Sequence, residues 1–131
     1  MSTHDKLRTP LKRARGLGSA KDGTHHFIVQ RITAVALVFL SIYVIGLVIS
    51  LVGGDYVAVR TAVASPANAV LLVAFLIATF WHAQLGMQVI IEDYVHTPWL
   101  AVTSQLLVIF VCVLAALASV LAVIRIALGG L

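Results

Sequence analysis

The sequence predicts an all-α integral membrane protein whose three helices cross the bilayer. Of the 131 residues, 61% are hydrophobic and only 11% are charged, whereas soluble domains are nearer half apolar and a quarter charged. Three long apolar runs, separated by glycine and proline signals, account for most of the chain after the first 23 residues. The length suits one domain, so we expect a single membrane unit with lipid as its main solvent.

The N-terminal segment, residues 1–23, is predicted to be a basic cytoplasmic tail. It holds six of the nine Lys and Arg residues of the chain. Positive charge beside a span marks the cytoplasmic side and meets anionic headgroups. We favour this interpretation over nucleic-acid binding, the other use of a basic tail. With the N-terminus in the cytoplasm, three crossings put the C-terminus outside.

Residues 24–131 are predicted to form the membrane domain, and its first span runs from about residue 27 to 52. Beyond its first five residues this run holds no charged residue, and it is long enough to cross the bilayer. Thr24 suits the N-cap of this helix, and Gly53-Gly54 suits its end. We expect residues 53–65 to be a short polar connection on the outer side.

The second and third spans are predicted over residues 66–95 and 98–128. Each begins with a two-residue signal, Ser65-Pro66 or Thr97-Pro98. The hydroxyl residue suits the N-cap and the proline suits the first helical position. Gly129-Gly130 suits the end of the third helix. The turn between the two helices is tight and, in this orientation, cytoplasmic.

His82 is the chemically distinctive residue of the second span. It is the only histidine near mid-membrane, where a polar side chain is costly enough to need a reason. Gly86 follows one turn along the same side, and Asp93 returns to within about 20° of the same direction. A histidine with a glycine one turn away suits a flat, bulky ligand, and haem, bound through an axial imidazole, is the candidate. A hydrogen bond from His82 to a neighbouring helix is the alternative.

Glu92, Asp93 and Tyr94 form an acidic–aromatic cluster at the end of the second helix. Acidic residues at a helix C-terminus oppose the macrodipole at a cost of a few tenths to about 1 kcal/mol. Departures from such local rules concentrate at functional sites. Asp93, on the His82 face, is predicted to deliver protons, whereas Glu92 is more simply a solvated group that pairs with a partner's basic residues. Tyr94 is either a hydrogen-bond donor or an interfacial aromatic.

Polar residues also gather at the entrance to the first helix, namely His25, His26, Gln30 and Arg31. We predict that Arg31 and His25 contact haem propionates or another anion, and contact with lipid headgroups is the alternative. The sequence has no flavin or nucleotide motif, and its single cysteine, Cys112, leaves no thiolate cluster for iron–sulfur centres. The chain is therefore predicted to act as a subunit.

Two segments of the chain carry extended residue patterns around these polar positions. The first is residues 18–27, GSAKDGTHHF, followed by Gln30-Arg31. The second is residues 82–96, HAQLGMQVIIEDYVH, in which H-x-x-x-G-M precedes an Asp-Tyr pair that starts eleven residues after the histidine. Both segments resemble the bacterial succinate dehydrogenase hydrophobic membrane anchor subunit. The resemblance extends over about residues 18–128 and includes the three-span layout.

The resemblance implies a role for each of these residues. His82 would be one axial ligand of haem b, Tyr94 would hydrogen-bond a ubiquinone carbonyl, and Asp93 would support quinone protonation. Arg31 and His25 would lie close to the haem propionates. The family often has aspartate where this chain has His26.

The resemblance also implies partners in a bacterial inner (cytoplasmic) membrane. They are a flavoprotein subunit that carries FAD and oxidises succinate, an iron–sulfur subunit, and a second membrane anchor subunit of the cytochrome b556 type. Because this chain has one mid-membrane histidine, a bis-histidine haem needs its second ligand from another polypeptide. Two rival functions remain open, the anchor subunit of a quinol:fumarate reductase and a haem-free, proton-coupled transporter or channel subunit.

Overall fold

The computed structural model describes residues 21–129 of the chain, and the side chains of residues 24–129. This part of the chain folds into helices alone. In chain order they are α2 (Lys21–Ser50), α3 (Tyr56–Ala64), α4 (Pro66–Tyr94) and α5 (Pro98–Ala127). Three of them, α2, α4 and α5, are long and apolar enough to cross a membrane, which confirms the predicted all-α, three-span architecture. Most of the expected basic tail lies outside the described residues.

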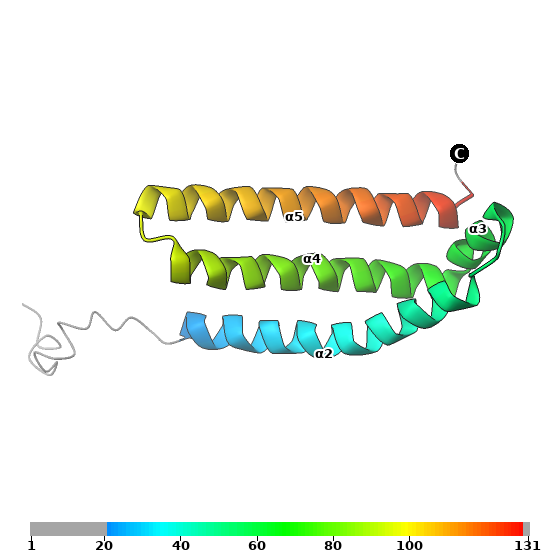
Figure 1. Cartoon of the computed structure of the whole chain (residues 1–131), viewed down its shortest axis with the longest axis horizontal. Coiled ribbons are helices and arrows are strands. Elements are labelled where there is room, and N and C mark those ends of the chain that lie inside the picture. The colour runs from blue at the N-terminus through cyan, green and yellow to red at the C-terminus, as the bar shows by residue number, and fades with distance from the viewer. Residues whose placement is uncertain (1–20, 130–131) are drawn as a thin grey trace, which may run out of the picture.

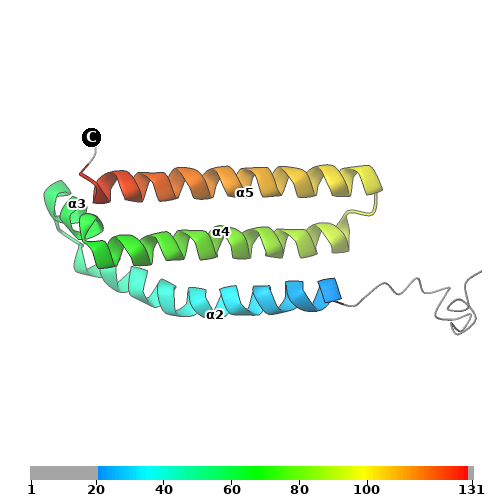
Figure 2. The ribbon, with the colours of Figure 1, turned by 180° about the vertical axis from the view of Figure 1, so that it is seen from behind.

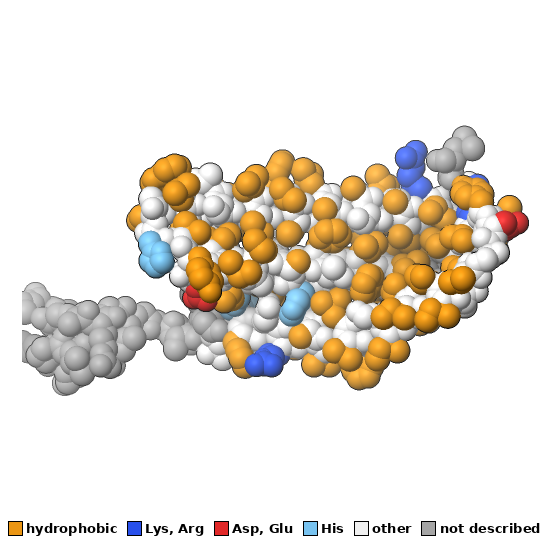
Figure 3. Space-filling view, in the orientation of Figure 1, with side chains coloured by type: hydrophobic (Ala, Val, Ile, Leu, Met, Phe, Trp, Pro, Cys, Tyr) orange, Lys and Arg blue, Asp and Glu red, His pale blue; other side chains and the backbone are white. Residues whose placement is uncertain are grey.

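The three long helices lie side by side in one layer, with α4 in the middle (Figures 1 and 2). Helix α4 packs against both α2 and α5, while no Cα of α2 lies within 8 Å of a Cα of α5 in the described part of the chain. Such a layer has two broad faces. Very few side chains are buried within it, and Figure 3 shows one face that is largely hydrophobic. Many large hydrophobic side chains of all three long helices are exposed, so the layer offers apolar surface to lipid or to another protein.

The long helices are longer than the hydrocarbon core that they cross. They have 29 or 30 residues each, which at 1.5 Å per residue is about 45 Å, against about 30 Å of hydrocarbon. Their ends therefore reach the headgroup region on both sides. The α4–α5 turn and the first turns of α2 lie at the same end of the layer (Figure 1).

The starts of the helices agree with the sequence only in part. Pro66 and Pro98 are the first residues of α4 and α5, and Ser65 and Thr97 occupy the N-cap positions, although neither side chain makes a capping hydrogen bond. The prediction for Thr24 is wrong, because α2 already begins at Lys21 and Thr24 lies inside the helix. None of residues 21–23 is a proline, so nothing in them prevents the helix from beginning three residues before Thr24.

The connection between the first two spans is not an irregular loop, because most of it forms the short helix α3. Asp55 is its N-cap, and Asp55 Oδ1 accepts a hydrogen bond of 2.8 Å from the Ala58 backbone N–H. Gly53 adopts a positive φ of 82° just after α2, a conformation that glycine reaches without steric cost. Gly129 follows Leu128, the C-cap of α5, and has φ 70°, as expected for a glycine that ends a helix.

A polar cluster ties α3 to the long helices at this end of the layer. The Asn68 amide Nδ2 donates a 2.7 Å hydrogen bond to the Ala62 carbonyl in the last turn of α3, where helical carbonyls lack partners within the helix. The Tyr43 hydroxyl of α2 donates to Asn68 Oδ1. One asparagine at the start of α4 therefore holds both α2 and α3.

Candidate functional site

His82 lies just past the middle of α4, on the side that packs against α2. Its ring is half-buried, and its Nδ1 lies 2.9 Å from Thr33 Oγ1 of α2, within hydrogen-bond distance. Because this contact uses Nδ1, Nε2 is the ring nitrogen left for a ligand. The alternative role predicted for His82, a hydrogen bond to a neighbouring helix, is thus present. It engages only one of the two ring nitrogens.

Thr33 is one of the most buried polar residues in the described part of the chain, with 8% of its surface exposed. Its Oγ1 also lies 2.9 Å from the Val29 carbonyl and 3.1 Å from the Gln30 carbonyl of its own helix. Back-bonding of this kind satisfies a threonine hydroxyl in an apolar span. The sequence contained a signal for Thr33, a polar side chain inside the first apolar run, but no spacing within one helix reveals its partner on another.

Gly86 lies one turn beyond His82 and faces the same neighbouring helix. A Cβ added at this glycine would lie 3.9 Å from the Gln30 side-chain nitrogen Nε2, an ordinary van der Waals distance. The Gln30 Oε1 is buried and has no hydrogen-bond partner among the described residues. The predicted His82–Gly86 face is therefore the α2-facing side of α4.

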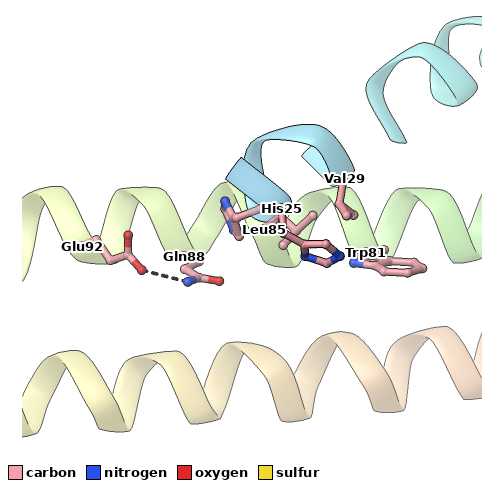
Figure 4. A pocket seen from close by; sticks show the side chains of 7 residues that line it. His25, Val29, Trp81, Leu85, Gln88 and Glu92 are labelled. Carbon is pink, nitrogen blue, oxygen red and sulfur yellow. Dashed lines mark hydrogen bonds between the residues drawn. The ribbon is translucent and has the colours of Figure 1, made fainter. Parts of the chain in front are cut away.

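A cleft of about 470 Å³ opens between the first turns of α2 and the second half of α4 (Figure 4). Polar groups converge on it from both helices. Gln88 Nε2 donates a 2.8 Å hydrogen bond to Glu92 Oε1 at its edge, and His26 Nε2 is buried without a hydrogen-bond partner in the described structure. The residues that line the cleft are His25, His26, Val29, Trp81, Leu85, Gln88 and Glu92.

The two residues predicted to bind propionates do not share one surface of α2. His25 lines the cleft and is exposed. Arg31 is also exposed, but it is absent from the cleft lining, and its guanidinium carbon stands 5.1 Å from the centre of the Phe27 ring. Six residues along a helix is a rotation of about 240°, which separates the two side chains.

Asp93 and Tyr94 end α4, and both are exposed, with 77% of the Tyr94 surface open. Neither lines the cleft, whereas their neighbour Glu92 does. Successive helical residues point about 100° apart, so the Asp93 and Tyr94 side chains leave the helix in directions different from that of Glu92 and from each other. Along the helix axis, Tyr94 is about 18 Å from His82.

The comparisons with known proteins agree in the family they indicate. Residues 5–121 match the profile of the succinate dehydrogenase/fumarate reductase transmembrane subunit family. The relatives below all bear the name succinate dehydrogenase hydrophobic membrane anchor subunit. The Rickettsia bellii protein is 38% identical over 93 residues, which cover 71% of this chain and 74% of the relative. The Rickettsia conorii protein is 31% identical over 117 residues, 88% of this chain and 93% of the relative. The Paracoccus denitrificans protein is 33% identical over 86 residues, 66% of this chain and 67% of the relative.

Proposed function

Because the chain belongs to the succinate dehydrogenase/fumarate reductase transmembrane subunit family, we propose that it holds one side of a haem b and part of a quinone-reduction site in a succinate:quinone oxidoreductase. It is a succinate dehydrogenase membrane anchor subunit and a multi-pass protein of a bacterial inner membrane. The haem ligand and the quinone contacts are the parts that we propose.

The observation that carries the haem assignment is the position of His82 in α4 and its contact with Thr33. The imidazole is half-buried just past the centre of a 29-residue span, and Thr33 engages Nδ1 at 2.9 Å. A metal-binding histidine commonly has its second ring nitrogen held in this way. The residues present therefore fit a haem bound through Nε2. When bound, the haem supplies a one-electron acceptor inside the membrane.

The second haem ligand is proposed to come from the second membrane anchor subunit. In the described residues no other histidine lies in the middle of a span, and no cluster of three metal-binding side chains occurs. The FAD and the iron–sulfur clusters are assigned to the flavoprotein and iron–sulfur subunits, because this chain has one cysteine and no flavin motif. The chain therefore supplies a quinone with electrons only as part of the assembled complex.

The quinone is proposed to bind at the end of α4. Reduction of a quinone to a quinol takes two electrons and two protons, so the site needs a hydrogen-bond donor for a carbonyl oxygen and a proton source. The exposed Tyr94 hydroxyl can donate to the carbonyl, and the neighbouring Asp93 carboxyl can transfer a proton and regain it from water at the membrane edge. Electrons reach the quinone from succinate through the partner subunits.

Arg31 and His25 are proposed to supply positive charge at the same end of the membrane. Arg31 remains exposed although its guanidinium stands over the Phe27 ring, so its donors can reach an anionic group on a partner or on the haem. His25 reaches the cleft from the other side of α2. We propose that these residues meet the haem propionates or lie near the bound quinone.

Two tyrosines of nearly equal exposure provide the test of the quinone site. Tyr94 is 77% exposed at one end of the layer, and Tyr56 is 75% exposed in α3 at the other end. In the purified complex, Tyr94→Phe should slow succinate-dependent quinone reduction by about 2- to 12-fold, the value of one hydrogen bond. It should leave succinate oxidation by a soluble dye and the b-type haem spectrum unchanged. Tyr56→Phe is the control and should leave all three unchanged.

Two results would contradict the proposal. Full quinone reductase activity in Tyr94→Phe would make Tyr94 an interfacial aromatic residue. A wild-type complex that lacks the reduced-minus-oxidised bands of haem b, yet reduces quinone at full rate, would remove the haem assignment for His82.

A further inference from the structure

We propose that Thr33 is a positioning residue for His82, holding the imidazole as the tautomer protonated at Nδ1 and so presenting the Nε2 lone pair as the metal-binding atom. The proposal rests on the proposed function for the identity of the metal group. Thr33 and His82 are both residues of this chain, so the contact between their side chains needs no partner subunit.

The contacts of the Thr33 hydroxyl decide where its proton lies. Three atoms surround Oγ1: the Val29 carbonyl oxygen at 2.9 Å, the Gln30 carbonyl oxygen at 3.1 Å and His82 Nδ1 at 2.9 Å. The two carbonyl oxygens can only accept, and a hydroxyl has a single proton. If that proton pointed at Nδ1, both carbonyls would face oxygen lone pairs. The Thr33 proton therefore points to the carbonyls, and His82 Nδ1–H donates to Oγ1.

Burial makes this arrangement persistent. Thr33 is 8% exposed, so water does not readily replace either partner, and an unmet polar group there would cost about 1–3 kcal/mol. Because the Nδ1–H points at α2, the ring is turned so that Nε2 points away from Thr33. The contact thus fixes both the protonation and the orientation of the imidazole before any metal group binds.

The chemical consequence concerns the donor strength of Nε2. An imidazole whose Nδ1–H donates a hydrogen bond is a more basic ligand, and a more basic ligand favours ferric over ferrous iron. Loss of the Thr33 hydroxyl should therefore weaken haem retention by about 10- to 100-fold, the usual effect of removing such a partner. It should also raise the haem reduction potential, with each tenfold change in the ferric-to-ferrous preference equal to 59 mV.

The test uses three variants of the assembled complex. Thr33→Val keeps the shape of the side chain and removes the hydroxyl, while Thr33→Ser keeps the hydroxyl. Thr79→Val is the matched control, since Thr79 also lies in a long helix and its hydroxyl donates to a carbonyl of its own helix, that of Phe75, at 2.7 Å. The readouts are haem content, the rate of haem loss to an apoglobin, and the haem potential by redox titration.

We expect faster haem loss and a raised haem potential in Thr33→Val. The rate of haem loss and the haem potential should stay near wild type in Thr33→Ser and should not change in Thr79→Val. An unchanged potential and haem-loss rate in Thr33→Val would overturn the proposal. So would equal defects in Thr33→Val and Thr33→Ser, because Thr33 would then act through packing between α2 and α4 rather than through its hydroxyl.

A His82→Ala complex separates this inference from the proposed function. If His82→Ala loses the haem while Thr33→Val behaves as wild type, only the role of Thr33 falls. If His82→Ala keeps the haem with unchanged spectrum and potential, the ligand assignment falls, and the role of Thr33 falls with it.

Discussion

The substitution Gly86→Ala separates what this glycine does for the chain from what it does for the proposed haem. Among the described residues, an added Cβ would meet only the Gln30 side-chain nitrogen within 4 Å outside the local helix backbone, at 3.9 Å, which is ordinary contact. Alanine is also more favourable than glycine within a helix by about 0.8–1 kcal/mol. Within the chain itself, the substitution should therefore be neutral or stabilising.

The haem gives the opposite expectation for Gly86→Ala. If a flat ring approaches α4 where Gly86 lacks a side chain, a methyl group there overpacks the site at a cost of about 1–3 kcal/mol. At 1.4 kcal/mol per tenfold change, haem retention should weaken by about 5- to 150-fold. The assay measures the haem-to-flavin ratio of the purified complex and the rate at which the haem passes to an apoglobin.

A second helical glycine provides the control for this experiment. Gly46 lies within α2, and a Cβ added there would meet no atom of the described part of the chain within 4 Å, apart from its own helix backbone. Gly46→Ala should retain the haem as the wild type does. Wild-type haem retention in Gly86→Ala would refute the packing role of Gly86, and equal haem loss in both variants would point to a general effect of alanine on the helices.

Two further predictions concern the ends of the layer. Asp93→Asn should slow quinone reduction on the order of 100-fold, because a proton donor is lost. The haem spectrum should stay unchanged. The control is Asp55→Asn, at the exposed N-cap of α3, since asparagine also caps helices. Quinone reductase rates of the two complexes check this, and equal rates would contradict it. Asn68→Leu should destabilise the complex by about 1–3 kcal/mol, because the Tyr43 hydroxyl loses its acceptor and α3 loses its tie to α4. Thermal unfolding and proteolysis between α2 and α4 measure this effect. Ser50→Ala is the control, because it removes an exposed hydroxyl that donates a hydrogen bond to the Leu47 carbonyl. Unchanged stability of Asn68→Leu would contradict the prediction.

The three long helices could be predicted from the sequence because the lipid bilayer imposes a simple requirement on a membrane span. A span must be long and apolar, and Pro66 and Pro98 mark where two of the spans begin. Helix α3 was missed because nine residues with mixed polarity carry no membrane signal. Its one local signal was Asp55, a good N-cap residue, which the expectation of a polar connection passed over.

The candidate site was predictable along a single helix and not between helices. Helical periodicity placed Gly86 on the same side as His82, and the structure directs that side toward α2. The Thr33–His82 contact joins residues 49 positions apart. It depends on how each of the two packed helices is rotated about its axis, which the sequence of one helix does not determine. The cleft between α2 and α4 was missed for the same reason, because its lining comes from both helices.

A change of ligand gives the most direct test of the proposal that His82 ligates a haem iron. In the complex that carries His82→Met, near-infrared magnetic circular dichroism of the oxidised haem reports the axial ligand pair, and a His96→Met complex, altered at an exposed position after α4, is the control. We predict that His82→Met either replaces the bis-imidazole signature and raises the potential, as a thioether ligand does, or loses the haem, while His96→Met matches wild type. An unchanged bis-imidazole signature at full haem content in His82→Met would contradict it.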